Sequence, residues 1–103
     1  MKLIDLDPNW VGAGGEGITR NGLPVPRRDG VGISFNCPCG SCGNEVYIGF
    51  KNPLDGLGPY DSVGPLWDRQ GNNFEILSVT PSIQRIGGCE WHGYITNGEL
   101  IKV

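Results

Sequence analysis

The sequence predicts a small all-β domain, mostly antiparallel and with few or no helices, that folds around a zinc-ribbon-like metal knuckle. Apolar residues alternate with polar or small ones in several short runs, as they do in strands with one buried face. The 103 residues include 18 glycines and 8 prolines, a composition typical of short strands joined by tight turns. No window of ten residues shows helical periodicity. We therefore expect a single zinc-stabilised β domain over residues 1–103, small enough to gain from a metal staple.

The strand predictions rest on alternation at every second position. Three runs carry it most directly, namely residues 31–35, 45–50 and 74–79. The first two flank a cysteine-rich loop, so the middle of the chain is interpreted as strand, metal loop, strand.

The end of the chain predicts a hairpin. Asn97-Gly98 separates two strand-like runs, and a type I′ turn needs positive φ at both central residues, which this dipeptide tolerates. Residues 3–6 are interpreted as a short strand or arm, and residues 81–83 as a brief extended segment. The Pro- and Gly-rich residues 52–66 are expected to form a long irregular surface connection.

Charge and hydropathy exclude several classes of partner. The net charge is −3, and no basic run exceeds Arg27-Arg28, so the concentrated basic footprint of a nucleic-acid-binding protein is missing. No apolar run approaches the roughly 20 residues that span a bilayer. Because an acidic residue, Asp5, stands near the N-terminus, we expect no secretory signal peptide. We therefore expect the protein to stay in a reducing cytoplasm, where clustered cysteines more often bind metal than form disulfides.

The cysteines and the single histidine gather in two clusters. One holds Cys37, Cys39 and Cys42, and the other holds Cys89 and His92. Zinc is usually held by four such ligands in a tetrahedron, commonly as two close pairs from separate segments. The run from Cys39 to Cys42, with Gly43 after it, has the form of a zinc knuckle whose backbone amides can face the sulfurs. The sequence therefore predicts a zinc site with five candidates for four positions.

The preferred ligand set is Cys39, Cys42, Cys89 and His92, with Cys37 as a substitute. A closed set of four ligands predicts a structural zinc ion, whose binding free energy is largely folding free energy. Three other interpretations remain: a disulfide from the first cluster to Cys89, a catalytic thiol and base formed by Cys89 and His92, and a catalytic zinc with an open position. A catalytic zinc needs a nearby acid or base, and the local carboxylates, Glu45 and Glu90, are expected to be solvated.

Five segments resemble an uncharacterised family of small bacterial, prophage and phage proteins. They are Leu6-Asp7-Pro8 with Trp10-Val11-Gly12; Gly32 through Cys37-Pro38-Cys39-Gly40; Asn52-Pro53-Leu54-Asp55-Gly56; Thr80-Pro81-Ser82-Ile83; and Gly88-Cys89 with Trp91-His92-Gly93 and Ile95-Thr96-Asn97-Gly98. The resemblance covers nearly the whole chain and implies a metal centre at the cysteine cluster and Cys89/His92, in a phage setting, with no reaction assigned. Relatives often have Cys-Pro-Cys-Gly-Cys, whereas Ser41 is inserted here, so the choice between Cys37 and Cys39 stays open.

These observations together predict a phage-encoded protein that is not an enzyme. Its expected role is a structural-zinc module for protein–protein contact, as a virion accessory component or as an early protein that binds a host factor. A small zinc-dependent hydrolase is the alternative. The expected partner is a protein, a phage structural protein or host factor, rather than nucleic acid or a membrane. The expected location is the host cytoplasm or the virion.

Overall fold

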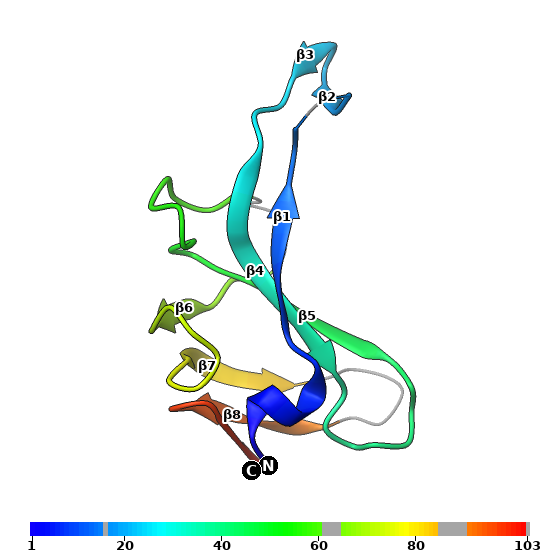
Figure 1. The fold of residues 1–103 in the computed structure, drawn as a ribbon, viewed down its shortest axis with the longest axis vertical. Helices are drawn as coiled ribbons and strands as arrows, with labels where there is room; N and C mark the ends of the chain where they lie inside the picture. The colour runs from blue at the N-terminus through cyan, green and yellow to red at the C-terminus, as the bar shows by residue number, and fades with distance from the viewer. Residues whose placement is uncertain (16, 61–64, 85–90, 103) are drawn as a thin grey trace.

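The computed structural model describes residues 1–15, 17–60, 65–84 and 91–102. Within those ranges the chain is almost entirely β-structure, which confirms the predicted fold class (Figure 1). The elements are η1 (Leu3–Leu6), β1 (Asn9–Ala13), β2 (Thr19–Arg20), β3 (Leu23–Pro24), β4 (Arg28–Asn36), β5 (Glu45–Gly49), β6 (Asp68–Gln70), β7 (Ser78–Gln84), β8 (His92–Thr96) and β9 (Glu99–Lys102).

One antiparallel sheet has the strand order β1-β4-β5. Its centre is the long strand β4, whose apolar residues Val31, Ile33 and Phe35 are buried, as the alternation predicted. Strand β5 pairs with β4 from Gly32↔Gly49 to Asn36↔Glu45, so the two strands bring the cysteine-rich turn between them to one end of the sheet. The strand–loop–strand prediction is confirmed.

A second antiparallel sheet has the order β6-β7-β8-β9. Its last two strands form the hairpin predicted at Asn97-Gly98, where φ is 49° and 72°. Strand β7 is central, and its pairing with β8 shifts between Val79↔Ile95 and Ile83↔Gly93, so β7 bulges there. The bulge contains Pro81, which has no N–H for a regular ladder.

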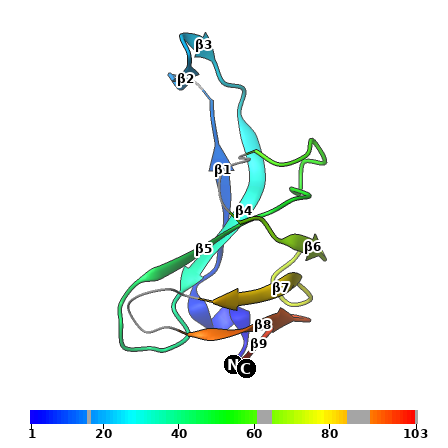
Figure 2. The ribbon, with the colours of Figure 1, turned by 180° about the vertical axis from the view of Figure 1, so that it is seen from behind.

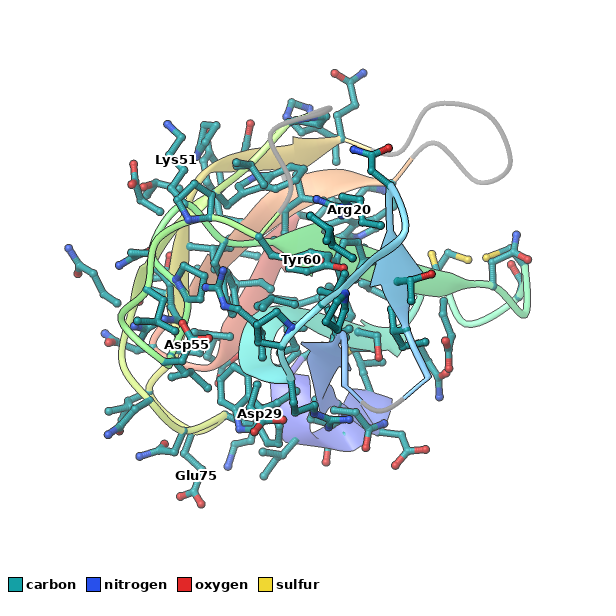
Figure 3. All side chains as sticks on the ribbon, turned by 90° about the horizontal axis from the view of Figure 1, so that it is seen from above. Arg20, Asp29, Lys51, Asp55, Tyr60 and Glu75 are labelled. Atoms are coloured by element: carbon teal, nitrogen blue, oxygen red, sulfur yellow. The ribbon has the colours of Figure 1, made fainter. Side chains whose placement is uncertain are left out.

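The two-stranded ribbon of β2 and β3 extends from the end of the first sheet, away from the second (Figures 1 and 2). Its turn is Asn21-Gly22, both residues with positive φ. Arg20 of this ribbon places its guanidinium carbon 5.3 Å from the ring centroid of Tyr60, so the ribbon also contacts the 50–60 connection (Figure 3).

Side chains from both sheets and from η1 form one core. Among those with almost no exposure are Leu3, Ile33, Phe35, Phe50, Leu77 and Ile95. The strand or arm predicted at residues 3–6 is instead one turn of 3₁₀ helix, because that turn lets Leu3 and Leu6 both reach the core. The Leu3 amide also donates to the Gly98 carbonyl at 2.8 Å, which fixes η1 against the last hairpin.

The strand predicted over residues 74–79 is wrong for its first four residues, since β7 begins only at Ser78. The side chain of Asn73 explains the difference: its Oδ1 accepts hydrogen bonds from the amides of Glu75 and Ile76, at 3.0 and 3.2 Å. These bonds close a turn that competes with the extended conformation. Phe74 then stacks on Trp10 at 4.5 Å between ring centroids rather than joining a strand. No helix in the described ranges has the length and apolar character that crossing a membrane requires.

Candidate active site and metal centre

The turn between β4 and β5 brings three thiols together. The Sγ atoms of Cys37, Cys39 and Cys42 lie within 4.8 Å of one another. Two backbone hydrogen bonds shape the turn: the Cys37 amide donates to the Asn44 carbonyl at 2.9 Å, and the Gly40 amide donates to the Cys37 carbonyl at 3.2 Å. Cys37 is buried and the other two are half-buried, so the cluster faces the core rather than open solvent.

The turn also favours a thiolate at Cys39. Its Sγ accepts the amides of Ser41 and Cys42, at 3.5 and 3.4 Å, as the knuckle interpretation anticipated. These backbone hydrogen bonds, from Ser41 first and Cys42 second, lower the pKa of the Cys39 thiol to about 5. Thiolate is the form that binds metal, so the electrostatics and the spacing agree.

The three thiols fit a thiophilic metal ion. In a tetrahedral site with Zn–S bonds near 2.3 Å, two sulfurs stand about 3.8 Å apart, which is compatible with the separations in this cluster. Cys37 is thus one of the clustered thiols, although the preferred set from the sequence held it only as a substitute. Cys89 and Glu90 lie outside the described residues.

His92 has a different neighbour in the described structure. It lies on β8, and its Nε2 is 3.0 Å from the Oγ of Ser82 on β7. It is not among the described residues that cluster with Cys37. The ligand set predicted from the sequence therefore stays a prediction at Cys89 and His92.

The register of β7 and β8 explains how Ser82 and His92 meet. Gln84 pairs with His92 and Ile83 pairs with Gly93. Side chains alternate along a strand, so Ser82 lies on the same face as Gln84, diagonal to His92. Ile83 points into the core and is 3% exposed, which leaves Ser82 and His92 on the outer face of the sheet. Both side chains are half-buried, so each is sheltered and still within reach of solvent.

Trp67 contacts the backbone of β7 at Ser82. Its indole Nε1 donates to the Ser82 carbonyl at 3.4 Å. The backbone of Trp67 is bonded in turn to the end of the first sheet: its amide donates to the Gly49 carbonyl at 2.9 Å, and its carbonyl accepts the Lys51 amide at 2.8 Å. The Ser82 carbonyl is therefore held by a residue that is anchored on the first sheet.

A hydroxyl hydrogen-bonded to an imidazole is the arrangement that activates serine. When Nε2 is unprotonated, it accepts the Oγ proton as the oxygen attacks a carbonyl carbon. Sequence reasoning missed Ser82, which stood only in a segment expected to be briefly extended. Ser82 could have been identified as a candidate only from its position opposite a histidine on the neighbouring antiparallel strand. That position depends on the strand register.

One protein-family model matches residues 17–103, and the family is described as "Bacterial ubiquitination-like system serine protease (BubE)". The matched segment contains Ser82, His92 and all four cysteines. No curated protein and no solved structure matches the chain.

This match corrects the functional expectations from the sequence. The chain was expected not to be an enzyme and to serve as a phage-encoded interaction module, and both expectations are wrong because the family is one of serine proteases. The error came from preferring His92 as a metal ligand and from considering it as a base only for the thiol of Cys89, since an imidazole serves equally as the base of a serine nucleophile. The resemblance is supported only as far as a bacterial family. Because the match covers most of the chain, this protein belongs to the BubE family, the serine proteases of bacterial ubiquitination-like systems.

Proposed function

We propose that this chain is a serine peptidase that uses Ser82 as its nucleophile and His92 as its general base. The observation that carries the proposal is the 3.0 Å separation of Ser82 Oγ and His92 Nε2 in a chain of a serine protease family. The expected partner is then a polypeptide substrate, a protein component of a bacterial ubiquitination-like system.

The chemistry follows from the two side chains. Ser82 Oγ attacks the scissile carbonyl carbon while His92 Nε2 takes the hydroxyl proton. His92 then gives that proton to the leaving nitrogen, the C–N bond breaks, and the acyl group remains on Oγ. In the second half-reaction water attacks the ester carbonyl carbon and loses a proton to Nε2. His92 then returns that proton to Oγ as the ester C–O bond breaks, which releases the acid and restores the Ser82 hydroxyl. The Trp67–Ser82 hydrogen bond serves to keep the nucleophile strand in place.

The thiol cluster is proposed to hold a structural zinc ion. Cys37, Cys39 and Cys42 supply three ligands in this proposal, and Cys89 is the candidate for the fourth on sequence grounds alone. This assignment leaves His92 free to act as the base. The zinc contributes folding free energy and takes no part in bond cleavage.

A fluorophosphonate probe tests the nucleophile directly. An activated serine oxygen forms a bond to phosphorus, fluoride leaves, and the probe stays attached. The wild-type protein should be labelled at Ser82, as peptide mass mapping would locate, and Ser82→Ala should not be labelled at all. Ser34→Ala, which removes a half-buried serine hydroxyl from β4, is the matched control and should be labelled like wild type. Labelling that survives Ser82→Ala would refute the proposal.

A further inference from the structure

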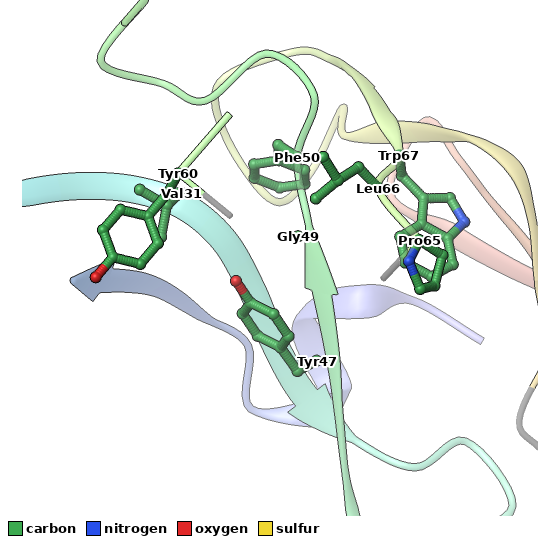
Figure 4. A pocket seen from close by; sticks show the side chains of 8 residues that line it. All are labelled: Val31, Tyr47, Gly49, Phe50, Tyr60, Pro65, Leu66 and Trp67. Carbon is green, nitrogen blue, oxygen red and sulfur yellow. The ribbon is translucent and has the colours of Figure 1, made fainter. Parts of the chain in front are cut away.

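A cleft of about 230 Å³ opens where the end of β5 meets the segment that leads into β6. Figure 4 shows Tyr47 and Tyr60 on one side of it and Leu66, Pro65 and Trp67 on the other, with Gly49 on β5 between them. The described residues that line it are Val31, Tyr47, Gly49, Phe50, Tyr60, Pro65, Leu66 and Trp67.

The cleft adjoins the Ser82 site through a single residue. The Trp67 side chain forms part of the cleft wall, and its Nε1 donates to the backbone carbonyl of Ser82. A group that rests against this indole is therefore next to the strand that carries the nucleophile.

The lining favours an uncharged, apolar occupant. None of the eight lining residues carries a formal charge, and four of them are aromatic. Two arginines near the cleft already have partners: Arg28 is bound in a two-point ion pair to Asp55, and the guanidinium of Arg20 lies over the ring of Tyr60. A charged side chain in this cleft would lose water without meeting an opposite charge among the lining residues.

The size of the cleft points to one side chain. Pockets for drug-sized ligands and cofactors span about 300–1,000 Å³, and this cleft lies below that range. Tyr47 is 55% exposed, so the cleft is reached from solvent without rearranging the core.

We propose that this cleft binds one apolar or aromatic side chain of the polypeptide that Ser82 cleaves, and that Gly49 sets the size of the side chain admitted. The proposal rests on the proposed serine peptidase function. It adds a preference for uncharged, bulky residues at one position near the scissile bond.

Substitution of Gly49 tests the cleft most directly. A Cβ atom at this position would lie 3.1 Å from Leu66 Cδ2 and 3.5 Å from the Tyr47 hydroxyl, so alanine would put a methyl group between the two walls. No positive φ is required there, so the substitution narrows the cleft without backbone strain. Leu66→Ala widens the cleft. In the double variant Gly49→Ala/Leu66→Ala, the smaller side chain at position 66 restores the volume that the added methyl group occupies.

The experiment profiles cleavage of a defined pool of 14-residue peptides of mixed sequence, with cut sites read by mass spectrometry. Wild type should prefer a bulky apolar residue at one fixed position relative to the cut. Gly49→Ala should lower cleavage of those peptides about tenfold relative to peptides with alanine at that position. Gly49→Ala/Leu66→Ala should recover the preference, and Ile101→Ala on β9 is a control that should leave the profile unchanged.

Fluorophosphonate labelling of the same variants separates the two proposals. Failure to label wild type at Ser82 overturns the peptidase function itself. Equal labelling of wild type and Gly49→Ala, with identical cleavage profiles, overturns the cleft assignment alone. If Ser82 is labelled and no peptide of the pool is cut, amide NMR decides the matter. N-acetyl-phenylalaninamide should then shift the Gly49 amide and the Trp67 indole signals, N-acetyl-aspartamide should not, and absence of that contrast refutes the assignment.

Discussion

Ser82 and His92 lie on neighbouring antiparallel strands with Oγ and Nε2 3.0 Å apart, at diagonal positions of the β7–β8 ladder. Ten residues separate them in the chain, and the sheet brings them together on its outer face. In this arrangement the pairing of β7 with β8 itself sets the distance between the proposed nucleophile and the proposed base. Changes to either side chain should therefore act on chemistry far more than on folding.

His92→Gln should keep the fold and lose reactivity. Glutamine retains a polar, half-buried side chain but cannot take up the serine proton, so fluorophosphonate labelling of Ser82 should slow at least about a hundredfold. The melting temperature should change only by the equivalent of one hydrogen bond, about 1 kcal/mol. Labelling rates and thermal unfolding on the same preparation check both statements.

Gln84→Ala provides the control for His92→Gln, because Gln84 pairs with His92 across the ladder and is exposed. Ser82 in the Gln84→Ala variant should be labelled at the wild-type rate. A His92→Gln variant that labels as fast as this control would show that Ser82 is activated by some other group.

Trp67→Phe should slow the nucleophile while sparing stability. Phenylalanine keeps a ring in the cleft wall but cannot donate to the Ser82 carbonyl. We expect labelling by a small fluorophosphonate, which does not need the cleft, to slow about tenfold because Ser82 is less well positioned. The loss of unfolding free energy should stay near 1 kcal/mol.

Trp10→Phe is the matched comparison for Trp67→Phe. Trp10 lies on β1 in the first sheet, where it stacks on Phe74 and packs against the core, whereas Ser82 lies on β7 in the second sheet. The Trp10→Phe substitution should lower the melting temperature and leave the rate of Ser82 labelling unchanged. The reverse pattern, with Trp10→Phe slower and Trp67→Phe normal, would remove Trp67 from the positioning role.

Cys37→Ser should cost both zinc and stability. Cys37 is one of the three proposed thiolate ligands, so its loss leaves the ion with too few of them. Bound zinc measured by elemental analysis should then fall well below one per chain. Thermal unfolding should shift down by many degrees, as it should for wild type after chelation. Ser41→Ala, which removes only a hydroxyl 3.8 Å from Cys39 Sγ, should keep its zinc. Full zinc and a normal melting temperature in Cys37→Ser would return Cys37 to the role of a spare thiol.

The sequence was informative where structure is decided locally. The β4 and β5 strands follow from alternation over a few residues, and the hairpin at Asn97-Gly98 follows from the φ values that its turn demands. The three clustered thiols lie within six residues of one another, so spacing was enough to group them.

The candidate active site depends on strand register, which residue spacing along the sequence does not reveal. Ser82 meets His92 because the pairing of β7 with β8 shifts register between Val79 and Ile83, and a further slip of one residue would turn Ser82 to the opposite face. The false strand start before Ser78 has a similar origin, since alternation over residues 74–79 gives no sign that the Asn73 side chain closes a turn.

The Arg28–Asp55 pair should give the protein an acid-sensitive part of its stability. Arg28 Nε and Nη2 donate to the two carboxylate oxygens at 2.7 and 2.9 Å, and Nη2 also donates to the Gly58 carbonyl at 2.6 Å, which fastens the 53–58 loop to β4. The hydrogen bonds from Arg28, followed by the Leu57 amide, hold the pKa of the Asp55 carboxyl below its usual value. The pair's contribution is therefore fully present above the ordinary carboxyl pKa of about 3.9 and is lost as the pH falls through the lower folded value.

Asp55→Asn removes that contribution at every pH. Its melting temperature should lie below that of wild type by a constant amount at pH 7 and pH 5, and the gap should close as the pH is lowered below about 4. Asp29→Asn is the control, because Asp29 pairs with Arg27 at a site where both side chains are mostly exposed, so its effect should be small throughout. A gap for Asp55→Asn that keeps its full size at pH 2 would mean that the carboxylate charge does not hold the loop, and the stability of the 53–58 segment would have to come from the backbone bond between the Leu54 amide and the Gly30 carbonyl instead.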